Sequence, residues 1–266
     1  MYNPEIFVSM TATMQCIQKF VSSRNYYYVT GIVPAAKAAM LVNKFDERFH
    51  LRMSDGQRDT ARKRGRCSFH LVLFPLTGRT DFTFWLLRNA GTHPLLDSER
   101  WLDARETPIT WPFLYELRQI PVPPVLRTKY KRKDGSIAIN PVTWTWRFKR
   151  EELVRIRGNV RHWAGCRDER MERLVRGLGV APGFRAIRDD VFQLMQYINL
   201  QRVKRNAAPM ELPFRRWVSG KRSQTVPLSY LLGRVSRHAE TWFPPHVMRM
   251  DTVKIPELIG DENVAA

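Results

Sequence analysis

The apolar positions in the first hundred residues predict alternating helices and strands. Apolar side chains at intervals of three and four residues predict helices over residues 11–22 and 35–49. Aromatic and β-branched residues predict a strand over 26–29, which a glycine and a proline close. Two short apolar runs, 67–74 and 81–87, are typical of paired strands that are buried on both faces. This part of the chain therefore combines a sheet with helices.

The order of these elements corresponds to a ferredoxin-like domain over residues 1–110. A short strand at 49–53 would complete the β-α-β-β order, and a short helix is expected within 94–106. In such a domain the helices lie on one side of the sheet and leave the other side open. We therefore expect one accessible sheet face in this region.

The following region, residues 111–149, is predicted to be a strand and hairpin extension. Residues 113–120 alternate like a strand, which a proline-rich segment then breaks. Residues 125–131 and 142–148 look like two hairpin arms around a basic loop that is longer than a tight turn requires. The pattern therefore predicts a basic β-hairpin in this region.

Helical spacing dominates the remaining residues, 150–266. Two shorter apolar stripes precede a long amphipathic helix that begins near Phe184 and ends before Pro209. A last helix is expected from Leu228 to about Thr241. The fold class predicted for the chain is α+β, with a ferredoxin-like N-terminal sheet domain, a basic β-hairpin and a C-terminal helical part.

The net charge of the chain indicates what kind of partner the protein binds. The chain has 266 residues, 44% of them apolar, which is enough for a core, and its 44 Lys and Arg against 25 Asp and Glu give a net charge of +19. Like charges destabilise a compact state unless a polyanion or counterions offset them. Nucleic acid is the partner that this surplus favours, and an anionic membrane surface is the competitor.

The positive charge is concentrated in three clusters, each expected in a loop or a hairpin rather than on the basic amphipathic helix that membrane binding requires. Lysine and arginine in such clusters can neutralise backbone phosphates. The clusters are Arg58, Arg62, Lys63, Arg64 and Arg66; Arg127, Lys129, Lys131, Arg132 and Lys133; and Arg215, Arg216, Lys221 and Arg222.

The composition of the chain also indicates its compartment. The longest apolar stretches, such as residues 71–76, are far shorter than the roughly 18 to 20 residues of a spanning helix. The first 30 residues hold no secretory signal pattern, and the three cysteines are too few and too dispersed for a disulfide framework or a zinc site. We expect a cytoplasmic protein that does not bind membranes.

The segment from Tyr27 to Ile32, followed by a helix, resembles the first strand of RNA-recognition-motif domains. The basic segment at 58–65 is similar to the loop before that family's third strand, although Arg66 and Ser68 stand where the family has stacking aromatics. The resemblance implies that strand aromatics on an open sheet face stack on bases. Tyr26 and Tyr28 are the candidates, and half-buried strand aromatics are the alternative.

A second aromatic candidate lies in the hairpin region. Trp144 and Trp146 are two residues apart, so in a strand they point to the same face, and Arg147 follows them. They could form a stacking platform for single-stranded bases. The alternative is that both tryptophans belong to the core.

Catalytic patterns are scarce in the sequence. The six histidines are isolated, no phosphate-binding glycine loop is present, and no cofactor or metal is expected. The acidic pairs Glu151-Glu152 and Asp189-Asp190 are expected in the first turns of helices, where carboxylates complement the helix dipole. A metal-independent ribonuclease using His70 and the strand at 26–28 is the enzymatic alternative. The helices on either side of Gly179 predict either a helix-turn-helix motif or two simply packed helices.

Several segments resemble uncharacterised basic proteins of bacterial plasmids and integrative conjugative elements: residues 28–31, 71–74, 144–147 and 182–185. The resemblance implies a role in replication, transfer or maintenance of such an element. The function predicted from sequence is nucleic-acid binding, with single-stranded DNA or RNA favoured, by a protein that is not an enzyme. Two alternatives remain, the ribonuclease or another strand-processing enzyme, and a scaffold subunit that contacts other proteins in a nucleoprotein assembly.

Overall fold

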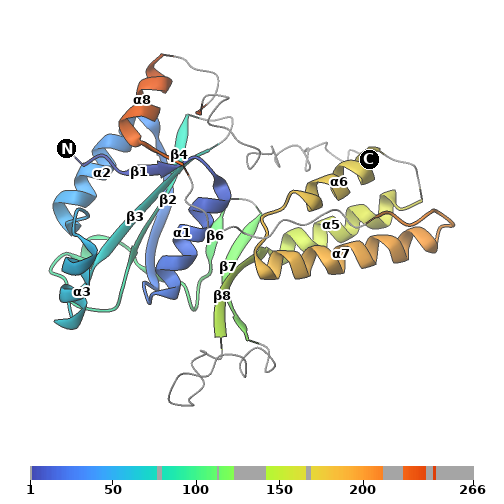
Figure 1. The fold of residues 1–266 in the computed structure, drawn as a ribbon, viewed down its shortest axis with the longest axis horizontal. Helices are drawn as coiled ribbons and strands as arrows, with labels where there is room; N and C mark the ends of the chain where they lie inside the picture. Colours follow the sequence, from blue (N-terminus) through green and yellow to red (C-terminus); the bar gives the residue numbers. More distant parts are fainter. Residues whose placement is uncertain are drawn as a thin grey trace. The chain divides into compact units, whose positions relative to one another are not determined.

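The computed structural model describes residues 2–76, 80–112, 114–122, 142–165, 169–211, 224–237 and 242–243. These residues form two compact units (Figure 1). Of the described residues, the first unit holds those within 2–109, 118–122, 142–144 and 224–243, and the second holds the rest. The mixed α+β class predicted from the sequence is confirmed.

The first unit is built on a four-stranded antiparallel sheet. Its strands are β2 (Tyr27–Pro34), β3 (Phe69–Pro75), β4 (Asp81–Arg88) and the short β5 (Leu102–Asp103), in the order β3-β4-β2-β5. Both β2 and β3 pair antiparallel with β4, so they run in the same direction and are joined by a helical crossover. That crossover consists of α2 (Ala35–Phe49) and α3 (Asp55–Lys63).

The ferredoxin-like arrangement predicted for this sheet is not confirmed. A β-α-β-β-α-β fold needs a second helix before its last strand, but described residues 89–101 contain only the single 3₁₀ turn η1 (Leu96–Ser98). The helix expected within 94–106 is replaced by η1 and β5, and the strand expected at 49–53 is a turn after α2. His50, in the left-handed conformation, ends α2 and starts that turn.

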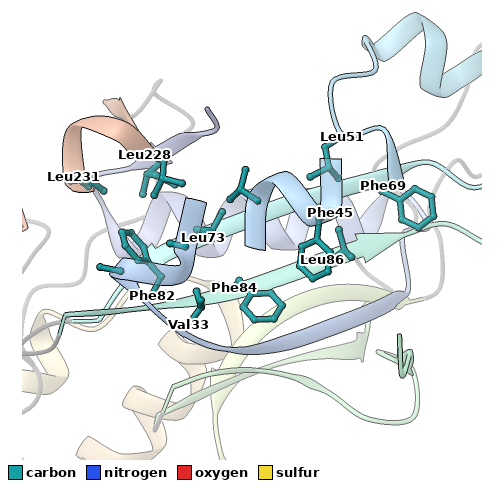
Figure 2. Packing of buried hydrophobic residues seen from close by; sticks show 14 of the residues in the cluster. Val33, Phe45, Leu51, Phe69, Leu73, Phe82, Phe84, Leu86, Leu228 and Leu231 are labelled. Atoms are coloured by element: carbon teal, nitrogen blue, oxygen red, sulfur yellow. The ribbon is translucent and has the colours of Figure 1, made fainter. Parts of the chain in front are cut away.

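The face of the sheet that packs on α2 forms the larger core of the unit. Phe45 of α2 lies 5.8 Å, ring centre to ring centre, from Phe84 of β4, and Figure 2 shows both rings among Val33 and Leu86. Ala35, Ala38 and Val42 bring α2 close to the strands because their side chains are small. All of these side chains are buried. Apolar residues at every second strand position therefore hold α2 on this face.

The opposite face is not open, which corrects the expectation of one accessible sheet face. The helix α1 (Met10–Ser22) buries Met14, Ile17 and Val21. Its Phe20 stacks on His70 of β3, with ring centres 4.0 Å apart. His70 alternates with the α2-facing residues of β3, so α1 lies on the other side of the sheet.

The C-terminal part of the described chain returns to the first unit. Residues of β1 (Glu5–Phe7) pair antiparallel with β9 (Thr225–Pro227), and α8 (Leu228–Ser236) follows directly. Leu228 and Leu231 join the core on α2 (Figure 2). The segment predicted to belong with the C-terminal helices therefore completes the N-terminal sheet unit instead.

A second sheet has the strand order β6-β7-β8, with bounds Ile109–Trp111, Tyr115–Pro121 and Val142–Phe148. The strands predicted at 113–120 and 142–148 correspond to β7 and β8. The other predicted hairpin arm, at 125–131, lies outside the described residues.

The helices of the second unit are α5 (Arg150–Trp163), α6 (Glu169–Gly179) and α7 (Arg185–Val203). Each buries an apolar stripe, as the periodicity predicted, and α7 is the long helix expected from Phe184. Within the described part of the chain, no helix combines the length and the apolar character that crossing a membrane requires.

Candidate nucleic-acid interface

The first basic cluster begins on a helix, so the expectation that it lies in a loop was wrong for its first three members, Arg58, Arg62 and Lys63. Ser54 starts α3 with a capping box: its Oγ accepts from the Gln57 N–H at 3.3 Å, and the Gln57 side chain accepts from the Ser54 N–H at 2.8 Å. Ala61 is the one buried residue of α3. A helix this polar shows no apolar stripe in the sequence.

Arg58 is part of the structure rather than of a free surface. Its Nη2 donates to the Leu51 carbonyl at 2.7 Å, and its Nη1 lies 3.4 Å from an Asp55 carboxylate oxygen. The side chain is only 16% exposed. Arg58 therefore ties α3 to the turn after α2, and its prediction as a phosphate-binding residue is corrected.

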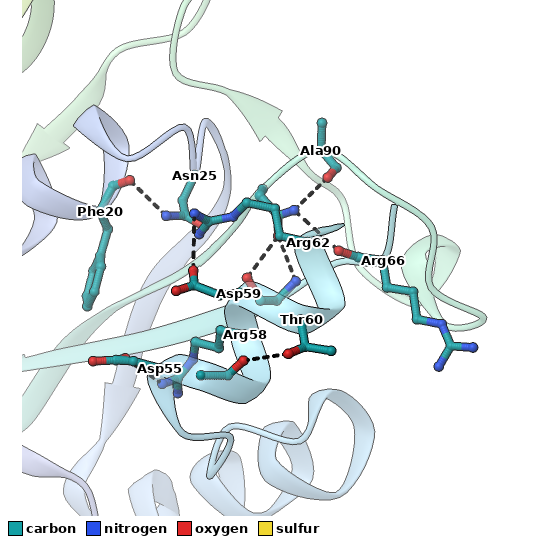
Figure 3. A network of polar contacts seen from close by, with 12 residues as sticks. Phe20, Asn25, Asp55, Arg58, Asp59, Thr60, Arg62, Arg66 and Ala90 are labelled. Carbon is teal, nitrogen blue, oxygen red and sulfur yellow. Dashed lines mark hydrogen bonds and ion pairs between the residues drawn. The ribbon is translucent and has the colours of Figure 1, made fainter. Parts of the chain in front are cut away.

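The other four cations of this cluster remain exposed and form what we call the α3 patch: Arg62, Lys63, Arg64 and Arg66. Arg62 is loosely paired, with its Nη1 3.8 Å from Asp59. Lys63, Arg64 and Arg66 have no acidic partner within 4.0 Å in the described part of the chain. Figure 3 shows the Arg66 guanidinium pointing away from the surrounding polar network.

A rigid support holds the loop end of the α3 patch. The backbones at Arg66 and Thr92 form a bridge, and the Thr92 N–H donates to the Gly65 carbonyl at 3.0 Å. Gly91 has a φ of +152°, and a Cβ there would lie 2.7 Å from the Arg66 carbonyl carbon. Only glycine fits this approach of two backbone segments, so the position of Arg66 depends on Gly91.

His70 lies beneath this region and is mostly buried. Burial, together with the positive charges of Arg58, Arg62 and Lys19, lowers its pKa to about 3, against an opposing effect of Asp55. His70 is therefore neutral at pH 7, stacked on Phe20, and has too low a pKa for an efficient general base. The geometry does not favour it as the centre of a ribonuclease site.

Tyr26 and Tyr28 do not form the pair of base-stacking aromatics that the sequence predicted. Tyr28 is 2% exposed, and its hydroxyl donates to the carbonyls of Thr107 and Pro108 at 3.1 and 3.2 Å. Burial raises the pKa of Tyr28 to about 12. Tyr28 offers no face to a base, because α1 covers this side of the sheet, whereas Tyr26 is half-buried.

Two arginines that the sequence did not single out lie on the neighbouring rings. The Arg105 guanidinium carbon is 4.8 Å from the Tyr26 ring centre, and that of Arg88 is 4.3 Å from the Tyr27 ring centre. Asp103 of β5 binds the Arg105 side chain at 2.5 to 3.1 Å, which lowers the pKa of the Asp103 carboxyl. The Arg105 contact holds the segment after β5 against the start of β2, and the Arg88 contact joins β4 to β2.

Trp144 and Trp146 are core residues, so the stacking platform is corrected. Their exposed fractions are 5% and 0%. The Trp146 ring meets Trp111 edge-on, with ring centres 6.4 Å apart, and the Trp144 carbonyl accepts from the Gln18 side chain. Both tryptophans fill the interior, the alternative that the sequence left open.

Arg147 is likewise engaged within the protein. Its Nη2 lies 3.1 Å from one oxygen of Asp190, whose other oxygen accepts from the Phe148 N–H at 3.1 Å. Asp190 is buried in the second turn of α7, not in its first turn as expected. Burial raises the Asp190 pKa, and Arg147 opposes that rise. The pair fixes β8 against α7.

The other two predicted clusters lie outside the described residues. These are Arg127, Lys129, Lys131, Arg132 and Lys133, and Arg215, Arg216, Lys221 and Arg222.

A further group of cations escaped the sequence reasoning because its members are far apart in the chain. Arg157 and Arg161 of α5 both contact Tyr197 of α7, and Lys204 and Arg205 follow α7 directly. Only the packing of α5 beside α7 brings them together. The sequence held one signal of this group: Arg157 and Arg161 are four residues apart on a helix, with no acidic residue between them.

Among the described residues, no group of three or more His, Cys, Asp or Glu side chains could hold a metal ion. Glu151 and Glu152 lie in the first turn of α5, as expected from the helix dipole. Cys67 is buried and Cys16 is partly buried, and burial raises the pKa of both thiols. These groups do not assemble into a site with evident chemistry.

Comparisons with known proteins find no relative of the chain: no protein-family model, curated protein or solved structure matches it.

Proposed function

We propose that this protein binds nucleic acid, with single-stranded DNA or RNA favoured, and that the α3 patch neutralises backbone phosphates. The observation that carries the proposal is the set of three exposed cations, Lys63, Arg64 and Arg66, that have no acidic partner among the described residues. They belong to a chain with a net charge of +19. Adjacent like charges that are not internally compensated favour a polyanionic partner.

The support under the α3 patch strengthens this proposal. Arg58 fixes the helix to the preceding turn, and Gly91 fixes the loop end. Because the backbone is already ordered, binding phosphate costs only the conformational entropy of the cationic side chains, so the arrangement favours binding. Of the two candidate strand tyrosines, base stacking would fall to Tyr26, because Tyr28 is buried and Tyr26 is only half-buried.

The biological setting belongs to the same proposal. The proposed setting is a cytoplasmic role in replication, transfer or maintenance of a bacterial mobile element, and a basic surface that contacts backbone phosphates suits such a role. The sheet would be a variant of a ferredoxin-like domain in which η1 and β5 take the place of the second helix and a full last strand. Single strands stay favoured over duplexes in this proposal, with the half-buried Tyr26 as the aromatic candidate for stacking on an exposed base.

The test compares two variants that remove equal charge. In Lys63→Ala/Arg64→Ala/Arg66→Ala the α3 patch loses its unpaired cations. The matched control, Lys37→Ala/Arg100→Ala/Arg176→Ala, removes three exposed cations that are scattered over the chain. Binding to labelled single-stranded DNA, single-stranded RNA and duplex is followed by fluorescence anisotropy across a salt series.

We expect the patch variant to lower the slope of log affinity against log salt by about 2 relative to wild type, since each phosphate contact on a single strand contributes about 0.7. The control should change the slope much less. Equal slopes for the patch variant and the control would overturn the proposed site. Arg58→Ala should instead lower thermal stability and leave the slope unchanged.

A further inference from the structure

The second unit carries a cation and aromatic cluster that α5 and α7 build together. The Arg161 Nε donates to the Tyr197 hydroxyl at 2.8 Å, and the Arg157 guanidinium carbon lies 5.8 Å from the Tyr197 ring centre. At the ends of the helices, Arg205 Nη1 donates to the His162 carbonyl at 3.2 Å. These contacts advance along both helices in the same direction, so α5 and α7 lie side by side and parallel.

Four exposed cations gather here with Tyr197, and we call the five residues the α5–α7 patch: Arg157, Arg161, Tyr197, Lys204 and Arg205. None of the four cations has an acidic partner within 4.0 Å in the described part of the chain. Arg157 and Arg161 stand at i, i+4 on α5, where like charges destabilise a helix. Because repulsion between these cations opposes folding, the patch favours the binding of an anion that offsets it.

Helix-end electrostatics explains only part of the patch. Cations near a helix C-terminus interact favourably with its free carbonyls, which accounts for the contact between Arg205 and His162. Arg157 lies further into α5, and its contact is the ring of Tyr197 rather than a carbonyl. The two α5 arginines are instead arranged around an aromatic plane.

The surrounding backbone keeps the cations in place. A Cβ at Gly165 would lie 3.1 Å from Arg205 Cδ, so glycine there leaves room for the arginine to reach α5. After α7, the chain folds back: Arg202 donates to the Ala208 carbonyl at 2.6 Å, and Asn199 exchanges two hydrogen bonds with the Met210 backbone. Lys204 and Arg205 therefore project from a turn that is tied to α7.

We propose that the α5–α7 patch is a second nucleic-acid contact surface, in which the four cations bind backbone phosphates of a single strand and Tyr197 stacks on a base. This inference rests on the proposed function and extends it to the helical unit. Guanidinium groups over an aromatic ring suit a phosphate beside a base. The main apolar stripe of α7 is buried inside the unit, but Leu200 and Val203 near its C-terminal end are exposed. An anionic membrane surface is therefore the competing partner, and the vesicle measurement below separates it from a single strand.

The full-length chain is tested with a single-stranded RNA that carries 4-thiouridine. Ultraviolet crosslinking followed by peptide mapping should place a crosslink on the peptide that contains Tyr197 in the wild-type protein. In parallel, the variant Arg157→Gln/Arg161→Gln/Lys204→Gln/Arg205→Gln is compared with a control that removes four scattered exposed cations, Lys37, Arg100, Arg176 and Arg237, by the same change to Gln.

We expect the patch variant to lower the salt slope by about 3 relative to wild type, because it removes four phosphate contacts of about 0.7 each. Arg157→Lys/Arg161→Lys should retain most of the slope but weaken the crosslink to Tyr197, since lysine keeps the charge and loses the planar contact. The crosslink needs no variant, so it decides the matter even if the fourfold change prevents folding.

The outcomes separate the two proposals. Wild-type binding with no crosslink at Tyr197, and with the patch variant indistinguishable from the control, would overturn this inference and leave the α3 patch standing. Absence of any nucleic-acid binding by the wild type would overturn both. Binding to phosphatidylserine vesicles that the patch variant loses, while RNA binding is unchanged, would assign the surface to a membrane and also overturn it.

Discussion

Protonation of His70 should destabilise the first unit, because the folded protein holds this ring neutral. The pKa of His70 in the folded state is about 3, lowered first by burial and then by Arg58, Arg62 and Lys19. An unfolded histidine has a pKa of about 6.5. The folded state therefore binds the proton more weakly than the unfolded state, and stability is lost as the pH falls below about 6.5.

The size of the effect follows from the same shift. Each pH unit between the two pKa values costs up to about 1.4 kcal/mol, so lowering the pH from about 6.5 to about 5 should remove about 2 kcal/mol. That is a large part of the 5 to 15 kcal/mol by which domains are typically stable. Above about pH 7.5, where the unfolded histidine is also neutral, the contribution of His70 is fully present and does not change.

The assay is urea denaturation of the wild type and of His70→Phe across this pH range. Phenylalanine keeps a ring against Phe20 but does not titrate. Other groups, including His93, whose pKa is lowered by burial and by the nearby His50, titrate in both proteins and cancel in the difference. Parallel pH profiles for the two proteins, or a His70 resonance that titrates near pH 6.5, would refute the reasoning.

Three further changes test the packing that positions the candidate sites. Trp146→Ala should lower the free energy of unfolding by about 3–5 kcal/mol, because the ring is fully buried. An unchanged urea midpoint would mean that the ring is exposed to solvent. Asp190→Ala should cost about 1–3 kcal/mol by leaving the buried Phe148 N–H without its acceptor, and a loss below about 0.5 kcal/mol in chemical denaturation would contradict this role of the carboxylate. Gly91→Ala should cost about 2 kcal/mol because its Cβ would meet backbone atoms, whereas Gly158→Ala, which faces open space on α5, should raise the melting temperature slightly; equal melting temperatures would count against the close approach at Gly91.

Elements with strong apolar periodicity could be predicted from the sequence, and α3 could not. The buried stripes of α2, α6 and α7 repeat at helical spacing, and the apolar runs of β3 and β4 mark strands buried on both faces. In α3 only Ala61 is buried, so hydrophobic pattern gives no signal. The capping box at Ser54 and Gln57 was the physical clue to that helix.

Several features of the structure depend on contacts between residues far apart in the chain, and local sequence patterns could not predict them. The pairing of Ile6 with Val226 places the C-terminal strand beside the N-terminal one, although no local pattern requires it. Whether Trp146 faces water or the core depends on what covers β8, which spacing within the strand does not reveal. The α5–α7 patch exists only because two helices pack in parallel.

The most direct test of the central claim is the salt dependence of wild-type binding to single-stranded RNA and DNA. If the three unpaired cations of the α3 patch and the four cations of the α5–α7 patch together neutralise about seven phosphates, the slope of log affinity against log salt should be about −5. Affinity should then fall roughly a thousandfold between about 50 and 200 mM salt. Affinity that stays constant across this range would contradict the account.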